Sequence, residues 1–187
     1  MFKMVPFSTD LDLSDFYKSA KERGYVNNSS QHMIYDCFIN EREHQTWILY
    51  YNNIPIGSCA AHSFDEMGRN SYRILTRTCV FTDKINGVYG SNLRTLSVIT
   101  EHQNPTGQFY IPTCIEWAGK DSKLFMTSNS LEGGSQRKVH KIYFPALEKT
   151  GQVDHICDMQ YRGTMQSVWQ LNVKKYCKVL NQKPRWI

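Results

Sequence analysis

The polar segment SVITEHQNPTGQF, residues 97–109, precedes an apolar pattern typical of a helix. It contains Pro105 and Gly107, which favour a loop. Unpaired N–H groups and the positive end of the dipole make a helix N-terminus a site for anions such as phosphate. The segment either holds a phosphate group or is only a turn, and the sequence leaves both interpretations open.

Besides phosphate binding, the six cysteines could provide thiol chemistry. Each cysteine lies in an apolar run, and no Cys-x-x-Cys motif occurs; the six are Cys37, Cys59, Cys79, Cys114, Cys157 and Cys177. Free cysteine is among the most buried residue types. We therefore expect reduced core thiols in a cytoplasmic protein, without a metal site or a disulfide framework.

The formal charge of +5 and a pI of about 8.8 suit a polyanionic ligand of any kind. The basic clusters QRKVHK and VKKYCKVLNQKPRW are interpreted as solvated faces. With no run of 18 apolar residues and an N-terminus that soon turns acidic, we expect neither a membrane span nor a signal peptide.

Hydrophobic periodicity predicts the elements that must position these groups. A helical period occurs over 12–24, 27–41, 111–120, 132–151 and 173–182. Alternation predicts strands over 4–7, 46–51, 56–64, 71–81, 123–129, 153–161 and 164–172. Pro112 restricts its helix to begin near Ile111, and Pro145 should kink the next helix, because proline removes a backbone hydrogen bond.

Residues 83–103 fit this order least well, and we expect them to be a helical insertion. The hairpins imply antiparallel pairing and the strand–helix–strand units parallel pairing. The length and order predict a single α+β domain over 1–187 with a mixed sheet.

That order resembles the GNAT (Gcn5-related N-acetyltransferase) superfamily over about residues 2–172. The local match is CIEWAGKDSKLFMTSNS (114–130) with VHKIYFPALEKTGQV (139–153). The chain is also similar to uncharacterised GNAT-like proteins of marine T4-like phages, a likeness that implies no activity.

The resemblance implies an acyl-CoA cofactor, acetyl-CoA or another thioester. The family holds its pyrophosphate with a Gln/Arg-x-x-Gly-x-Gly/Ala loop, which corresponds here to QNPTGQ. Gln103, Asn104, Thr106, Gly107 and Gln108 would then bind the cofactor. Thr106 and Gln108 replace the glycines, and Pro105 removes one amide donor, so this loop is degenerate.

The family also places pantetheine between two splayed strands, here 72–81 and 123–129. The resemblance implies that the backbone of Cys79, Val80 and Phe81 and the side chain of Asn129 contact it. The family's general acid, a Tyr, aligns with Leu147. Tyr143 lies one turn earlier and can substitute, or it is a core aromatic.

An amine nucleophile needs a base that titrates near neutrality. His62, Asp65, Glu66 and Glu116 are available, and His62 is preferred, although a lone His in an apolar strand is often structural. Cys79 can also act as an acyl-carrying nucleophile, but no His or Asp lies near it in sequence.

The sequence thus predicts an acyl-CoA-dependent N-acyltransferase with a primary amine acceptor that it does not identify. The alternative is a catalytically inert GNAT-like module that binds a protein partner, which the degenerate loop favours. We expect no nucleic-acid binding, because the chain shows no recognised module and no concentrated basic stripe.

Overall fold

The computed structural model describes residues 2–22, 41–80, 109–129 and 139–181. The predicted helix 27–41, the insertion 83–103 and the loop 103–108 lie outside these residues, apart from Glu41. In the described ranges a seven-stranded sheet runs in the order β1-β2-β3-β4-β5-β7-β6. The predicted mixed sheet is confirmed, because β4 and β5 are parallel and the other pairs are antiparallel.

The N-terminal half forms four consecutive antiparallel strands. β1 (Phe2–Pro6), β2 (His44–Tyr51), β3 (Ile54–Ser63) and β4 (Ser71–Val80) pair in sequence order. Helix α1 (Ser14–Glu22) follows β1, and a short 3-10 helix, η3 (Asp65–Met67), follows β3. Asp12 caps α1 by accepting a hydrogen bond from the Ser14 N–H at 3.2 Å.

The C-terminal half begins with α3 (Ile111–Ala118), which starts at the residue that Pro112 predicts. It continues through β5 (Lys123–Ser128), the π-helical turn η6 (Val139–Tyr143) and α5 (Phe144–Lys149). It ends with β6 (Val153–Tyr161), β7 (Thr164–Leu171) and α6 (Val173–Asn181).

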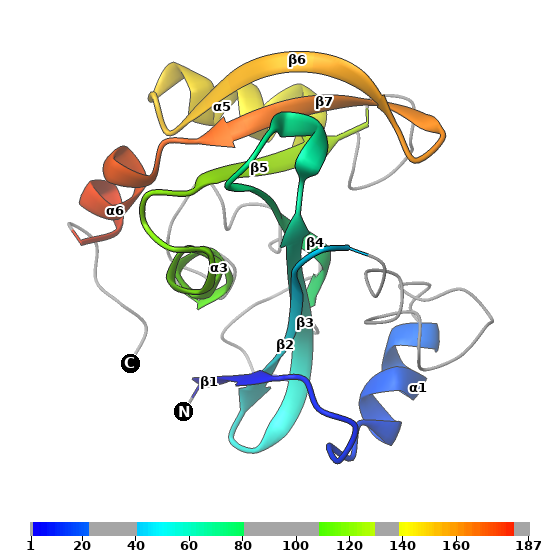
Figure 1. Cartoon of the computed structure of the whole chain (residues 1–187). Coiled ribbons are helices and arrows are strands. Elements are labelled where there is room, and N and C mark those ends of the chain that lie inside the picture. The colour runs from blue at the N-terminus through cyan, green and yellow to red at the C-terminus, as the bar shows by residue number, and fades with distance from the viewer. Residues whose placement is uncertain (1, 23–40, 81–108, 130–138, 182–187) are drawn as a thin grey trace.

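Helices cover both faces of the sheet. Figure 1 shows α1 and α3 on opposite sides of strands β2–β4. On the α3 face, Trp47, Leu49 and Cys59 pack with α3 and α5 in the main core. On the α1 face, Ile48 and Cys79 pack against Leu13, Phe16 and Ala20. Strand alternation explains why neighbours such as Ile48 and Leu49 enter different cores.

One predicted helix has a different buried face. The period predicts Ile142 and Ala146 on the core side, but Ile142 is 57% exposed and Ala146 is exposed. Leu147, which the same period predicts on the core side, is buried, and Phe144 is buried in addition. Pro145 has no N–H to donate, and the π-helical turn before it changes the rotation of the helix.

Candidate functional site

Strands β4 and β5 separate after a short parallel pairing. They pair at Ser71, Tyr72 and Arg73 of β4, opposite Lys123, Leu124 and Phe125 of β5. Beyond this point β4 continues to Val80 beside β3, and β5 continues to Ser128 beside β7. Figure 1 shows the two strands diverging. This opening, called the split here, corresponds to the splayed strands that the resemblance implies.

Strand β4 is irregular along the split. Its register with β3 runs from Arg73 opposite His62 to Thr76 opposite Ala60, and then to Cys79 opposite Ser58. Each step covers two residues of β3 but three of β4, so β4 holds an extra residue in each interval. Leu75, in the first interval, has a positive φ of 57°. Bulges of this kind turn backbone groups away from regular ladder pairing.

Two polar groups at the end of β4, the Thr78 hydroxyl and the Cys79 carbonyl, differ in their hydrogen bonds. Within the part of the chain that the structure describes, the buried Thr78 hydroxyl interacts with the Cys59 thiol and makes no hydrogen bond to a nitrogen or oxygen atom. The carbonyl of Cys79, predicted to contact pantetheine, accepts a hydrogen bond from the Tyr110 hydroxyl at 2.8 Å. Burial raises the pKa of Tyr110 well above its usual range, so this hydroxyl keeps its proton.

The Cys79 side chain is a poor nucleophile in this setting. Its thiol is buried on the α1 face, where its sulfur lies 3.3 Å from Ser58 Oγ. Burial raises the pKa of the Cys79 thiol, which disfavours the reactive thiolate. The structure therefore argues against acyl transfer through Cys79.

His62 lies in a row with Arg73 and Phe125 across β3, β4 and β5, at the point where the split begins. Its side chain is 0% exposed, and its Nδ1 lies 2.7 Å from the Ser63 carbonyl oxygen, to which it donates. Burial, supported by the charges of Arg73 and Arg162, lowers the pKa of His62 to about 4. A buried imidazole with this pKa holds a proton weakly, which does not suit a base that must remove one from an ammonium group.

Arg73 links the two strands at the same point. Its Nε and Nη2 donate to Thr127 Oγ1 of β5 at 3.0 and 2.6 Å. Its guanidinium also lies 4.9 Å from the centre of the Tyr161 ring. The Arg73 side chain therefore joins β4 to β5 across the start of the split, on the α1 face.

The other predicted residues have different placements. Asn129 is buried directly after β5, and Tyr143 is half-buried at the end of η6, packed against the main core. Val80 is the last residue of β4, and Phe81 lies outside the described residues with Gln103, Asn104, Thr106, Gly107 and Gln108. The structure therefore leaves the pyrophosphate loop as a prediction.

Sequence reasoning missed a hydrogen-bonded group at the carboxyl end of β5. Trp169 Nε1 donates to Ser128 Oγ at 3.0 Å, and the same oxygen lies 3.0 Å from His140 Nδ1. The signal was present in KLFMTSN, where Leu124, Met126 and Ser128 occupy one face of the strand. A polar side chain at the end of an apolar face is expected to have a hydrogen-bond partner, because burying a polar group without one costs free energy.

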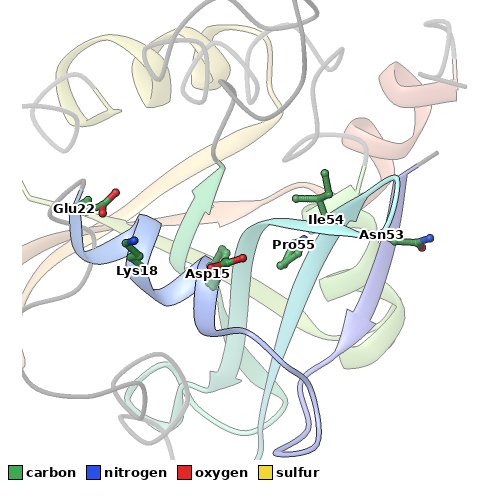
Figure 2. A pocket seen from close by; sticks show the side chains of 7 residues that line it. Asp15, Lys18, Glu22, Asn53, Ile54 and Pro55 are labelled. Atoms are coloured by element: carbon green, nitrogen blue, oxygen red, sulfur yellow. The ribbon is translucent and has the colours of Figure 1, made fainter.

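A separate hollow of about 540 Å³ lies between α1 and the β2–β3 hairpin. Figure 2 shows Asp15, Lys18 and Glu22 on α1 and Asn53, Ile54 and Pro55 on the hairpin. Phe16 also lines the hollow. Since none of the lining residues that the structure describes comes from β4 or β5, this hollow is distinct from the split. Among the described residues, no helix is long and apolar enough to cross a membrane.

Several solved structures with the same fold are described as acetyltransferases. A putative GNAT-family acetyltransferase from Desulfovibrio desulfuricans superposes with a TM-score of 0.57 at 8% identity, covering 92% of this chain and 99% of its own. A spermidine N-acetyltransferase chimera from Vibrio cholerae and hSSAT gives 0.53 at 10% identity, with coverages of 95% and 98%. A GNAT family acetyltransferase from Elizabethkingia anophelis with acetyl-CoA bound gives 0.50 at 12% identity, with coverages of 91% and 97%.

Neither a family profile nor a curated protein sequence matches the chain. The structural likenesses establish the GNAT fold, because they cover almost the whole chain and extend over the full length of the other proteins. At these identities they establish the fold alone.

Proposed function

We propose that the protein is an acyl-CoA-dependent N-acyltransferase, with acetyl transfer to a primary amine as its reaction. The observation that carries this proposal is the split itself. Two parallel strands separate after three paired residues, and the longer strand is bulged along the opening. Backbone groups of the described parts of β4 and β5 that do not pair with each other across the split can bind an extended ligand with amide groups, such as pantetheine.

The residues of the split fit such a ligand in part. The buried Thr78 hydroxyl, which contacts only the weakly bonding Cys59 thiol, is a polar atom that a ligand amide can bind, whereas the Cys79 carbonyl already accepts a hydrogen bond from Tyr110. Asn129 lies at the end of the opposite strand. Coenzyme A, when bound, would supply an activated acyl carbonyl. The residues of the chain would bind it, remove a proton from the amine and give a proton to the leaving thiolate.

The structure supports the predicted catalytic roles of Tyr143 and His62 to different extents. Tyr143 is half-buried on η6, next to the helix that covers β7, and stays the sequence-based candidate for the thiolate's proton donor. The burial and low pKa of His62 favour a positioning role at the start of the split over that of general base. The acceptor amine, the cytoplasmic location, the single domain and the phage likeness remain predictions.

The alternative, an inert module that binds a protein partner, has one observation in its favour. Tyr110 occupies a carbonyl acceptor that the resemblance assigns to the cofactor. The two functions are separated by whether coenzyme A binds in the split.

Hydrogen–deuterium exchange with and without acetyl-CoA tests this directly. We expect protection of residues 74–80 and 126–129, with β1 as an internal reference that does not change. Thiol release should then appear with at least one member of a panel containing a polyamine, a free amino acid and a lysine peptide. Protection confined to other elements, or none at saturating ligand, would refute the proposal.

A further inference from the structure

Three elements meet through side chains at the carboxyl end of β5. Ser128 is the last residue of that strand, Trp169 lies on β7 and His140 lies on η6. Ser128 Oγ is the shared atom, at 3.0 Å from both Trp169 Nε1 and His140 Nδ1. Ser128 is 0% exposed and Trp169 is 5% exposed, whereas His140 is half-buried.

The donors and acceptors of this group constrain the histidine. An indole N–H can only donate, so it uses one of the two lone pairs of Ser128 Oγ. The second lone pair can accept the Nδ1–H of His140. In that arrangement Nδ1 keeps its hydrogen, and Nε2 is the nitrogen that gains and loses a proton.

The charged groups around His140 come from its own element and from those packed against it. Asp158 on β6 interacts electrostatically with His140. The hydrogen bond from Ser167 is the main cause of the lowered pKa of Asp158, and His140 adds a smaller contribution. His155 on β6 bonds the same carboxylate at 3.1 Å, while Lys141 and Tyr143 lie on η6 with His140.

The position of the group links it to the split. Ser128 lies three residues beyond Phe125, the last residue of β5 that pairs with β4. Ligands of sheets with parallel strands bind at the carboxyl ends of those strands. Packing does not require a histidine here, because the surrounding face is formed by apolar residues such as Met126, Phe144 and Leu171.

We propose that His140 gives its Nε2 proton to the thiolate that leaves during acyl transfer, and that Ser128 and Trp169 are positioning residues. This inference rests on the proposed function. In the step, the amine nitrogen forms a bond to the thioester carbonyl carbon, and the carbon–sulfur bond breaks with its electron pair on sulfur. The sulfur takes the proton from His140, and the proton that the nitrogen loses restores the imidazolium, directly or through water.

The pKa of the thiol of bound coenzyme A tests the assignment without any acceptor. The ultraviolet absorbance of the thiolate reports it, and desulfo-coenzyme A serves as the ligand control for binding. An imidazolium next to the sulfur lowers the thiol pKa, so H140Q should raise it by about one to three pH units relative to the wild type. S128A should shift the thiol pKa in the same direction by less, and S128T, which keeps the hydroxyl, should restore it.

The outcomes separate the two proposals. If both ligands bind to the wild type and to H140Q, and the thiol pKa is the same in the two proteins, the role of His140 is refuted while the proposed function stands. A rise in Y143F without one in H140Q would transfer the role to Tyr143. If neither ligand binds to the folded wild type, both proposals fail.

Discussion

Replacing Tyr110 with phenylalanine should change stability and cofactor affinity in opposite directions. The Tyr110 hydroxyl is fully buried and donates to the Cys79 carbonyl at 2.8 Å. Its removal leaves a carbonyl without this donor, which costs about 1–3 kcal/mol. For a chain of this length, such a loss lowers the thermal midpoint by about 2–4 °C per kcal/mol.

The same change frees an acceptor in the split. If a pantetheine amide uses the Cys79 carbonyl, Tyr110 competes for it in the wild type. Removing the competitor should strengthen coenzyme A binding by up to about tenfold, the equivalent of one hydrogen bond. Urea unfolding gives the stability and isothermal titration gives the affinity.

A matched control is Tyr50→Phe, which removes a half-buried hydroxyl from a strand outside the split. It should leave the affinity for coenzyme A unchanged. If Tyr110→Phe loses stability and its affinity for coenzyme A is equal to or weaker than that of the wild type, the Cys79 carbonyl is not a cofactor contact. Unchanged stability would refute the hydrogen-bond argument itself.

Two further predictions concern the start of the split. Arg73→Gln and Thr127→Val should each destabilise the fold. A double-mutant cycle between them should give a coupling energy of about 1–3 kcal/mol, because the hydrogen bond that they share is charge-assisted. Additive effects would show that Arg73 does not hold β4 to β5. His62 should make the fold sensitive to acid. Burial lowers its pKa from 6.5 to about 4, so the unfolded chain binds the proton first as the pH falls. Stability should therefore decrease by up to about 3 kcal/mol from pH 6.5 to pH 4, and equilibrium unfolding of His62→Gln should show a shallower decrease over that window.

Much of the fold was predictable because its elements have clear periods and local signals. Pro112 placed the start of α3 at Ile111, and alternation placed the hairpin of β2 and β3. The buried face of the helix after β5 was not predictable, because Pro145 is preceded by a π-helical turn that a fixed 3.6-residue period does not describe.

The candidate site was less accessible to sequence reasoning. Periodicity showed that 71–81 forms a strand, but it could not show the two extra residues that β4 carries relative to β3. Trp169 is far from Ser128 in the sequence, and the pairing of β5 with β7 brings the two together. His140 joins them from η6, a contact that periodicity does not predict. The residue type alone favours His62 as a base, whereas its pKa is lowered by burial and by the charges of Arg73 on β4 and Arg162 in the β6–β7 turn, which the sequence does not show.

The most direct test of the central claim is the thermal midpoint with and without saturating acetyl-CoA, beside an equal concentration of ATP as a polyanion control. A ligand at about 100 times its dissociation constant stabilises the folded state by about 2.7 kcal/mol. For this chain that corresponds to a rise of about 5–10 °C. We predict this rise with acetyl-CoA and not with ATP. An unchanged midpoint with acetyl-CoA, or an equal rise with both ligands, would contradict specific binding of coenzyme A in the split.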